Sequence, residues 1–361
     1  MIQSSQLQSN TGMMSTDPLR IGIVGCGAVT ELAHLPLCTA MQGVKVTALV
    51  DPNIGRAEQL AKTFGVELVR RDTTDLAGVI DGAIVAAPHA YHARIGIDLL
   101  RQGIHVLVEK PMALTTAECD AMIEAAEKSR TVLAVGLMRR FAPWARYIKK
   151  VLDSGTLGKV RSFQIREGFK YSWPVASDFF FKKEAAGGGV LIDTGAHTLD
   201  TVLWWFGDVE RYEYYDDSEG GVEADCEVRL RMRDECMGTV HLSRTRNLGF
   251  RIRIEGERDV LEFDRTEKPG KFVLGDFCLQ GAVFKPVDPT NDGTLIPMIG
   301  ASLRDWRDAI RNGTPPTVTG YEGRRSISLI ESCYRHRQPL IYPWLDESAL
   351  KSLSSRPART L

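Results

Sequence analysis

Two side chains able to exchange a proton lie one helical turn apart in the otherwise apolar stretch Gly187–Gly207. Asp193 and His197 are at positions i and i+4 and share a helix face, which Asp200 continues one turn later. A helix that is apolar nearly all round is buried, and a buried carboxylate is costly unless it is paired. We therefore expect Asp193 to pair with His197 or with a ligand hydroxyl. The alternative is a satisfied core histidine, but Gly187–Gly189 weaken it because they leave the helix N-terminus open to close approach by another group.

A glycine turn near the N-terminus is the second chemical signal. The apolar strand predicted over Ile21–Val24 runs into a G-x-G turn and then a helix. The first glycine allows the tight turn, and the second has no side chain to hold a pyrophosphate away from the helix N-terminus. The third position of the G-x-G-x-x-G pattern is Thr30, which is tolerated if helix and strand lie slightly further apart. The turn residues predicted to bind a dinucleotide are Gly25, Gly27, Ala28 and Val29.

The second predicted strand, VKVTALVD, ends in Asp51. A carboxylate there accepts hydrogen bonds from the adenosine ribose hydroxyls and repels a ribose phosphate, which favours NAD over NADP. The alternative role for Asp51 is the N-cap of the following helix. We also include Arg56 in the cofactor site, and because of this cation NADP remains an alternative cofactor.

Two further strands end beside polar residues. The strands are predicted over Ala83–Ala87 and His105–Val108, and ligands of parallel sheets bind beyond such carboxyl ends. We expect the nicotinamide to project near the residues that follow, which are Pro88, His89, His92, Glu109 and Lys110. His89 and His92 could also be a metal pair, but no cysteine or carboxylate completes a recognisable set nearby. We predict no metal site.

The pattern of elements predicts two domains. Strands alternate with helices over 19–140, which predicts an α/β Rossmann-type, doubly wound parallel sheet. The alternation then stops, and residues 141–345 read as an α+β substrate-binding and oligomerisation domain. Its open, largely antiparallel sheet has several strands between Val209 and Val283. We expect a disordered N-terminal tail over 1–18 and a C-terminal tail over 346–361.

Together these motifs resemble the glucose-fructose oxidoreductase / inositol dehydrogenase / MocA family. GCGAV, AAPHAYHA, HVLVEKPMAL, GLMRRF, LDSGTLGKV and GGGVLIDTGAHTLD match its pattern in order, between about Leu19 and about Trp344. The resemblance implies that Lys110 stands beside the nicotinamide and the reacting hydroxyl, that Asp193 and His197 face the same point, and that the Lys110–Pro111 bond is cis. The chain departs from the family at Thr30 and in DFFFKK, where a Trp-Arg pair is common; the second departure bears on the substrate.

Oxidation of a secondary alcohol moves a hydride to the nicotinamide and a proton to a base, whose pKa should lie near the working pH. His197 qualifies without any shift. Our hypothesis is that His197 takes the hydroxyl proton, Lys110 binds and polarises the oxygen, and Asp193 orients the substrate or His197. The reverse division between Lys110 and His197 remains open, since burial and the positive nicotinamide would lower the pKa of Lys110.

The substrate is expected to be polyhydroxylated. Aromatic side chains are candidates for stacking on a sugar face, and cationic ones for binding its oxygens; the alternatives are packing beneath the loop and sheet-edge charges. The candidate residues for the substrate are Lys110, Arg139, Tyr171, Trp173, Lys182, Asp193 and His197, with Arg140 and Phe179–Phe181 considered beside them. The tetrapeptide MRRF resembles the inositol dehydrogenase branch.

Three function classes follow. The first is an NAD(P)-dependent dehydrogenase or ketoreductase acting on a sugar, cyclitol or sugar derivative. The second is a lyase or glycosidase-type reaction through transient oxidation with tightly bound NAD, which cofactor recycling without added oxidant would mark. The third is a non-catalytic dinucleotide-binding sensor, which should lack the lysine or the histidine that this chain has.

Composition limits the partners. The formal net charge is −1 over 361 residues, which points to neither nucleic acid nor an acidic membrane. We expect a cytoplasmic protein on three grounds. The seven cysteines are scattered and show no disulfide framework, and the polar N-terminus is unlike a signal peptide. The chain also has no apolar run long enough to span a bilayer. Arginines that alternate with apolar residues predict half-buried strands. In the resembled family such sheet faces often pair between subunits, which implies a homodimer or homotetramer.

Overall fold

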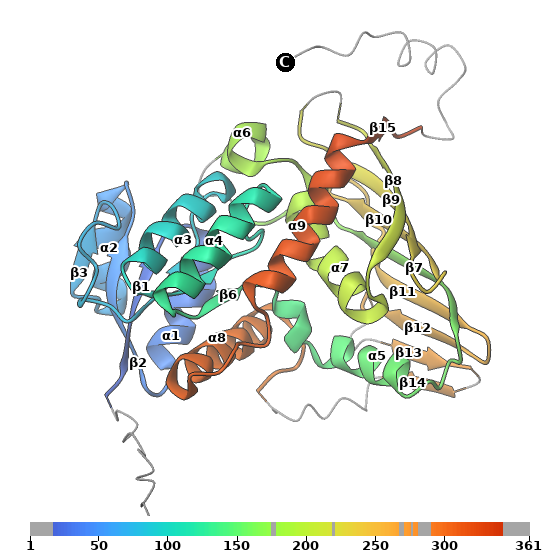
Figure 1. Ribbon diagram of the computed structural model, residues 1–361, viewed down its shortest axis with the longest axis horizontal. Helices are drawn as coiled ribbons and strands as arrows, with labels where there is room; N and C mark the ends of the chain where they lie inside the picture. The colour runs from blue at the N-terminus through green and yellow to red at the C-terminus, as the bar shows by residue number, and fades with distance from the viewer. Residues whose placement is uncertain are drawn as a thin grey trace, which may run out of the picture.

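The computed structural model describes most of both predicted domains (Figure 1). The described residues are 17–174, 178–218, 221–266, 271–275, 277–280 and 290–341. The predicted C-terminal tail, nearly all of the N-terminal tail, Val283 and Trp344 lie outside them. Among the described helices, none is long and apolar enough to cross a membrane.

The first sheet is parallel and doubly wound, as predicted. Its described strands lie in the order β3-β2-β1-β4-β5-β6, and the order reverses between β1 and β4. Such a reversal opens a crevice at the carboxyl ends of the strands. The strands are β1 Leu19–Val24, β2 Val44–Val50, β3 Leu68–Arg70, β4 Gly82–Val85, β5 His105–Val108 and β6 Leu133–Val135.

Helices cover both faces of this sheet because its central strands are apolar on both sides. One face packs against α3 His92–Arg101 and α4 Thr116–Ser129, and the other against α1 Leu35–Ala40 and α2 Ile54–Phe64. A π-helical turn, Thr30–His34, precedes α1.

A helix from late in the chain completes the second layer. In α8, Leu295–Asn312, the side chains of Leu303 and Trp306 belong to the same buried cluster as Ile21 of β1. The domain division at 141–345 assigned this segment to the second domain. The structure instead packs it on the first sheet, where Trp306 lies against Gly82.

The second sheet is mixed and mostly antiparallel, with the described order β14-β13-β12-β11-β7-β10-β9-β8-β15. Parallel pairing occurs between β10 and β7 and between β15 and β8. Its strands are β7 Val160–Gly168, β8 Val209–Asp216, β9 Asp225–Met232, β10 Met237–Ser243, β11 Gly249–Gly256, β12 Val260–Asp264, β13 Lys271–Leu274, β14 Phe277–Gln280 and β15 Arg337–Pro339.

Helices cover the face of this sheet that looks toward the first domain (Figure 1). These are α5 Pro143–Asp153, α7 Val190–Phe206 and α9 Gly320–Arg335, while the short α6, Lys183–Ala186, lies near α3. Helix α9 packs between α4 and α7 and so joins the two domains.

The space beside Gly188 and Gly189, before α7, is filled by groups of this chain and not left open to a ligand. A Cβ on Gly189 would lie 1.9 Å from the carbonyl oxygen of Glu223, and one on Gly188 would lie 2.1 Å from the hydroxyl of Tyr334. The Glu223 carboxylate accepts the backbone N–H groups of Gly189 at 2.8 Å and Leu191 at 2.9 Å. The N-cap residue of α7 is Gly189, which has no side chain, so Glu223 binds the free N–H groups in its place. This contact fixes the start of the helix that carries Asp193.

Asp200, the third ionisable residue of α7, has a structural role. Its carboxylate accepts hydrogen bonds from Arg140 Nε at 3.0 Å and Nη2 at 2.6 Å, and the side chains are 1% and 7% exposed. Arg140, considered above as a substrate ligand, is thereby occupied, and the pair ties the segment after β6 to α7.

We expect Asp200→Asn to lower the free energy of unfolding by about 3–5 kcal/mol, because it leaves Arg140 buried without a countercharge. Chemical denaturation followed by circular dichroism measures the change. Asp153→Asn removes the exposed partner of Lys149 and should cost at most about 1 kcal/mol. A loss from Asp200→Asn no larger than that control would contradict the structural role.

Candidate active site

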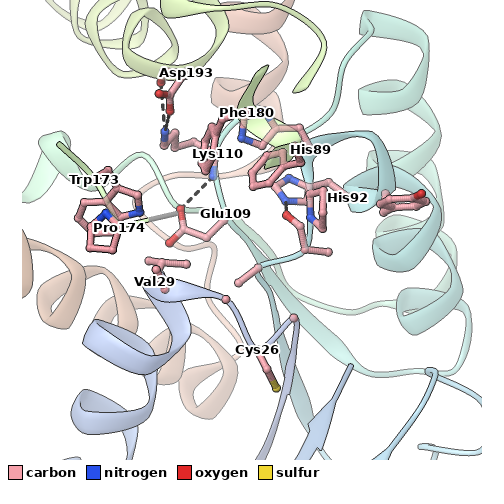
Figure 2. A pocket seen from close by; sticks show the side chains of 18 of the residues that line it. Cys26, Val29, His89, His92, Glu109, Lys110, Trp173, Pro174, Phe180 and Asp193 are labelled. Carbon is pink, nitrogen blue, oxygen red and sulfur yellow. Dashed lines mark hydrogen bonds and ion pairs between the residues drawn. The ribbon is translucent and has the colours of Figure 1, made fainter. Parts of the chain in front are cut away.

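One cavity of about 1100 Å³ lies where the carboxyl ends of the first sheet meet the second domain (Figure 2). Its volume is at the upper end of ordinary ligand sites, which leaves room for an extended ligand and a small second one. The cavity is lined by every residue predicted for the cofactor, namely Gly25, Gly27, Ala28, Val29, Asp51, Arg56, Pro88, His89, His92, Glu109 and Lys110.

The glycine turn has the backbone that a dinucleotide site requires. Gly25 has φ +99°, and a Cβ there would lie 2.4 Å from the carbonyl oxygen of Ala86. At Gly27 a Cβ would meet nothing within 4 Å, so that position stays open toward the cavity. Thr30 is fully buried and its hydroxyl donates to the Gly25 carbonyl at 2.6 Å. The unusual third residue therefore braces the turn.

Asp51 is held in place at the end of β2. Its Oδ2 accepts the N–H of Cys26 at 2.7 Å and its Oδ1 accepts the N–H of Asn53 at 2.8 Å. The N-cap of α2 is Asn53, whose side chain accepts the N–H of Arg56, so the alternative role for Asp51 is wrong. A carboxylate has about four acceptor positions, so Asp51 keeps two for a ligand.

Arg56 is already engaged within the chain. Its Nη2 pairs with the Glu31 carboxylate, and its Nε donates to the Cys26 carbonyl at 3.2 Å. This arrangement makes Arg56 a poor candidate for a ribose phosphate. Asp51 lines the cavity together with Asp72 and with Arg71, which donates to the Pro52 carbonyl.

The two histidines that follow β4, His89 and His92, are buried with ring nitrogens close to backbone carbonyl oxygens, and a neutral His92 ring has one N–H and can donate to only one of its two carbonyl neighbours. His89 Nδ1 lies 2.9 Å from the Ala186 oxygen, and the ring nitrogens of His92 each lie 2.7 Å from an oxygen, of Pro111 and of Ala87. Burial lowers the pKa of His89 to about 3. Within the described residues, no group of three or more His, Cys, Asp or Glu side chains is placed to hold a metal ion.

Glu109 and Lys110 face opposite directions (Figure 2). Glu109 also lines the cavity, and its Oε1 lies 2.9 Å from His34 Nε2. Burial alone would raise the pKa of Glu109, but the hydrogen bond from His34 and the Lys110 charge outweigh it and lower that pKa. The Lys110–Pro111 bond is cis, as the family resemblance implied.

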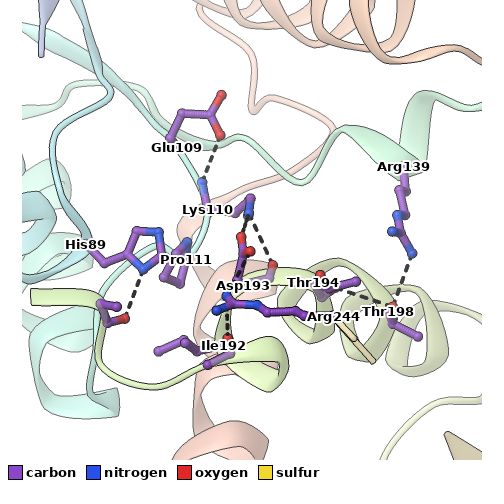
Figure 3. A network of polar contacts seen from close by, with 12 residues as sticks. His89, Glu109, Lys110, Pro111, Arg139, Ile192, Asp193, Thr194, Thr198 and Arg244 are labelled. Atoms are coloured by element: carbon purple, nitrogen blue, oxygen red, sulfur yellow. Dashed lines mark hydrogen bonds and ion pairs between the residues drawn. The ribbon is translucent and has the colours of Figure 1, made fainter. Parts of the chain in front are cut away.

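Lys110, Asp193 and Arg244 form the polar centre of the cavity wall (Figure 3). Lys110 Nζ donates to Asp193 Oδ1 at 2.5 Å, and Arg244 Nη2 donates to Asp193 Oδ2 at 3.0 Å. Burial by itself would raise the pKa of Asp193, but the two cations hold it well below its ordinary value. Asp193 is therefore ionised at any physiological pH, and the described contacts pair it with these cations rather than with His197.

His197 lines the same wall one turn along α7 and is 7% exposed. Its Nδ1 is buried and has no hydrogen-bond partner among the described residues. Burial, with Lys110 and Arg139 nearby, lowers its pKa well below the usual value. The ring is therefore neutral at physiological pH and has a free lone pair, but the expectation of an unshifted pKa is wrong, and the lowered pKa makes the ring a weaker base than an exposed histidine.

Two predicted substrate residues lie elsewhere. Arg139 donates to the Glu167 carboxylate from Nη1 at 2.9 Å and Nη2 at 2.5 Å, and to the Thr198 hydroxyl at 3.1 Å. Lys182 is exposed and pairs with Asp178 at 2.7 Å. Neither is among the residues lining the cavity.

Most of the aromatic candidates line the cavity. Tyr171, Trp173, Phe179 and Phe180 are among its lining residues, and the Phe179 and Phe180 rings pack against His89, whereas Phe181 is exposed and is not among them. Arg244 lies over the Tyr171 ring, 5.4 Å from its centroid, so that face of the ring is covered. The Tyr171 hydroxyl is buried without a partner among the described residues.

Arg244 is the site residue that sequence reasoning missed. It was grouped with the arginines of half-buried strands, yet it directly follows β10 and its side chain is 9% exposed. The signal that the sequence offered was the position of Arg244 just past a strand. Whether its side chain would point toward Asp193 depended on the register of β10 beside α7.

Comparisons with known proteins agree with this geometry. Residues 19–137 match the model "Oxidoreductase family, NAD-binding Rossmann fold", and residues 145–262 match the "GFO/IDH/MocA C-terminal domain". The chain is 30% identical to D-glucoside 3-dehydrogenase of Escherichia coli K12, over 54% of this chain and only 56% of that protein. It is 24% identical to myo-inositol 2-dehydrogenase of Thermotoga maritima, over 86% of this chain and 94% of that protein.

The fold is shared with a solved structure, aldose-aldose oxidoreductase from Caulobacter crescentus complexed with glycerol. The two superpose with a TM-score of 0.78 at 24% identity, over 88% of this chain and 97% of that one. With both domain models matched in order on a chain that has the dinucleotide turn and the Lys110–Asp193 pair, this protein belongs to the Gfo/Idh/MocA family of NAD-binding oxidoreductases.

Proposed function

We propose that this protein transfers a hydride between a nicotinamide cofactor, NAD rather than NADP, and a secondary alcohol or ketone of a sugar, cyclitol or sugar derivative. The observation that carries the proposal is the meeting of Lys110, Asp193 and His197 on the wall of the cavity that also contains the glycine turn and Asp51.

The residues present fit a dinucleotide. The open position at Gly27 admits a pyrophosphate close to the backbone, and Asp51 keeps acceptor positions for ribose hydroxyls. When bound, the cofactor supplies the acceptor or donor of the hydride, which no side chain can supply. Glu109 and Lys110, at the end of β5, would hold its reactive end.

The chain's own groups then handle the substrate oxygen and its proton. Lys110 donates a hydrogen bond to the reacting oxygen, and Asp193 holds the Lys110 ammonium in position. The neutral His197 ring accepts the hydroxyl proton in the oxidation direction and returns it in reduction. The pH profile of kcat in wild type and in His197→Gln distinguishes these roles from the reverse ones.

Recognition of the rest of the substrate falls to the loop after β7. Trp173 offers an aromatic ring for a sugar face, and the unpartnered Tyr171 hydroxyl offers a hydrogen bond. These groups suit a polyhydroxylated molecule.

The test is spectrophotometric. Purified protein is mixed with NAD or NADP and a panel of inositols, free sugars and sugar nucleotides, and the absorbance of reduced cofactor is followed. A signal with NAD that depends on Lys110 supports the proposal. Silence across the panel, in protein shown to bind the cofactor, would favour internal recycling or sensing.

Asp51→Ala should weaken NADH binding about 10- to 100-fold, because a charged acceptor is worth more than a neutral one. It should also narrow the preference for NADH over NADPH. Fluorescence titration with each cofactor measures both changes. Asp98→Ala, an exposed change on α3, is the control and should leave both affinities unaltered. An unchanged preference in Asp51→Ala would refute its role.

We further propose a cytoplasmic homodimer or homotetramer that pairs through the outer face of the second sheet. That face is open and carries ion-paired side chains, such as Arg253 with Glu262 and Arg251 with Asp264. Light scattering that gives a monomer mass would reject the assembly.

A further inference from the structure

Two cations share one carboxylate in the wall of the cavity. Lys110 and Arg244 each contact a different oxygen of Asp193, and the side chains are 19%, 9% and 14% exposed, respectively. This cluster, which we call the Lys110–Asp193–Arg244 triad, carries one net positive charge. A buried charge without a countercharge is unfavourable unless a ligand provides one.

The carboxylates nearby are committed elsewhere. Glu167 also lines the cavity, but Arg139 binds both of its oxygens. Glu109 lies on the other side of the Lys110 backbone, against His34, where the nicotinamide is expected (Figure 2). Lys170, which precedes Tyr171 in the chain, also lines the cavity and adds a further positive charge. The substrate end of the cavity is therefore cationic.

The Arg244 guanidinium has N–H groups that no described residue accepts. Of its three nitrogen atoms, Nη2 alone donates hydrogen bonds to the described residues, to Asp193 and to the Gly189 carbonyl at 3.0 Å. Its Nε is buried without a partner among those residues. The Tyr171 hydroxyl beside it is also unpartnered. A planar guanidinium with free N–H groups is suited to a carboxylate or a phosphate.

We propose that the substrate carries an anionic oxygen group, a carboxylate or a phosphate, which Arg244 binds while the reacting hydroxyl lies at Lys110. The inference rests on the proposed function and adds to it the charge of the substrate. Arg244 sets specificity in this arrangement, with the Tyr171 hydroxyl as a second donor to the same group.

The test uses binding, so that it stays separate from turnover. The protein loaded with NADH is titrated by calorimetry with D-glucitol, D-gluconate and D-glucitol 6-phosphate, which share a carbon chain and differ in charge. At least one anion should bind about 10-fold or more tightly than glucitol, and added salt should weaken the anion's binding selectively. The tighter of the two anions identifies the source of the charge.

Arg244→Gln should abolish the preference for the anion, while Arg251→Gln, which removes an exposed arginine of the same sheet, should retain it. Unchanged NADH affinity in Arg244→Gln shows that the variant is folded, and Arg244→Lys, which keeps the charge without the fork, should show an intermediate preference. Anions that bind no tighter than glucitol, or a preference that survives Arg244→Gln, would overturn the proposal. Tight anion binding without any Lys110-dependent cofactor reduction would instead overturn the proposed function and leave the anion site standing.

Discussion

Lys110→Ala is expected to lower kcat for alcohol oxidation by about two to four orders of magnitude. The change removes the hydrogen-bond donor that faces the reacting oxygen. It also leaves the Asp193 carboxylate with Arg244 as its remaining cationic partner among the described residues, so a negative group would face the oxygen that must gain electron density. Binding of NADH should be nearly intact, because the Lys110 ammonium is directed toward Asp193 of α7 (Figure 3), while Asp51 and the glycine turn are unchanged.

Two measurements check this result. Steady-state rates give kcat, and quenching or enhancement of NADH fluorescence gives the cofactor affinity. Lys149→Ala, whose side chain pairs with Asp153 on the surface of α5, is the matched control and should behave as wild type in both. Losses of similar size in kcat and in NADH affinity would argue against a role for Lys110 at the reacting oxygen.

The first domain was predictable because its signals are local. A buried parallel strand, a glycine turn and an acidic strand end lie within about 30 residues of one another, which is the span of one βαβ unit. The positive φ of Gly25 and the open space at Gly27 follow from the same few residues. Glu109 and Lys110 were predicted for the site because they directly follow a strand of the parallel sheet, β5.

The second domain and much of the polar network were harder to predict because their partners are far apart in the chain. Arg139 looked like a substrate ligand until the fold placed Glu167 beside it. Asp200 shared a face with His197 in the helical repeat, yet its partner comes from the segment after β6. Periodicity gives the face of a helix but does not say which charged group will be brought against it.

The layer formed by α8 shows the same limit at a larger scale. Its apolar residues follow helical spacing, but nothing local says that Trp306 packs on Gly82, more than 200 residues earlier. The result is a first domain closed by the end of the chain, and α9 then links it to α7. The helix that carries Asp193 and His197 is thus held from both domains, which fixes the distance between Lys110 and Asp193.

His197→Gln is expected to lower kcat for alcohol oxidation by about two to four orders of magnitude, because the amide cannot accept the hydroxyl proton. The wild-type pH profile adds a directional prediction. Since the pKa of His197 is lowered, mainly by burial and then by the charges of Lys110 and Arg139, the ring stays neutral as the pH falls through 6.5. The rate should therefore hold its plateau there and decline only at lower pH, where the ring becomes protonated.

The pH profile of kcat also separates His197 from Lys110 as the base. If His197 accepts the proton, His197→Gln should abolish the acid limb, while the control His241→Gln, on the second sheet beside Glu227, should keep both rate and profile. If Lys110 is the base, an acid limb should instead persist in His197→Gln, because the ammonium must lose a proton before it can accept the one from the substrate.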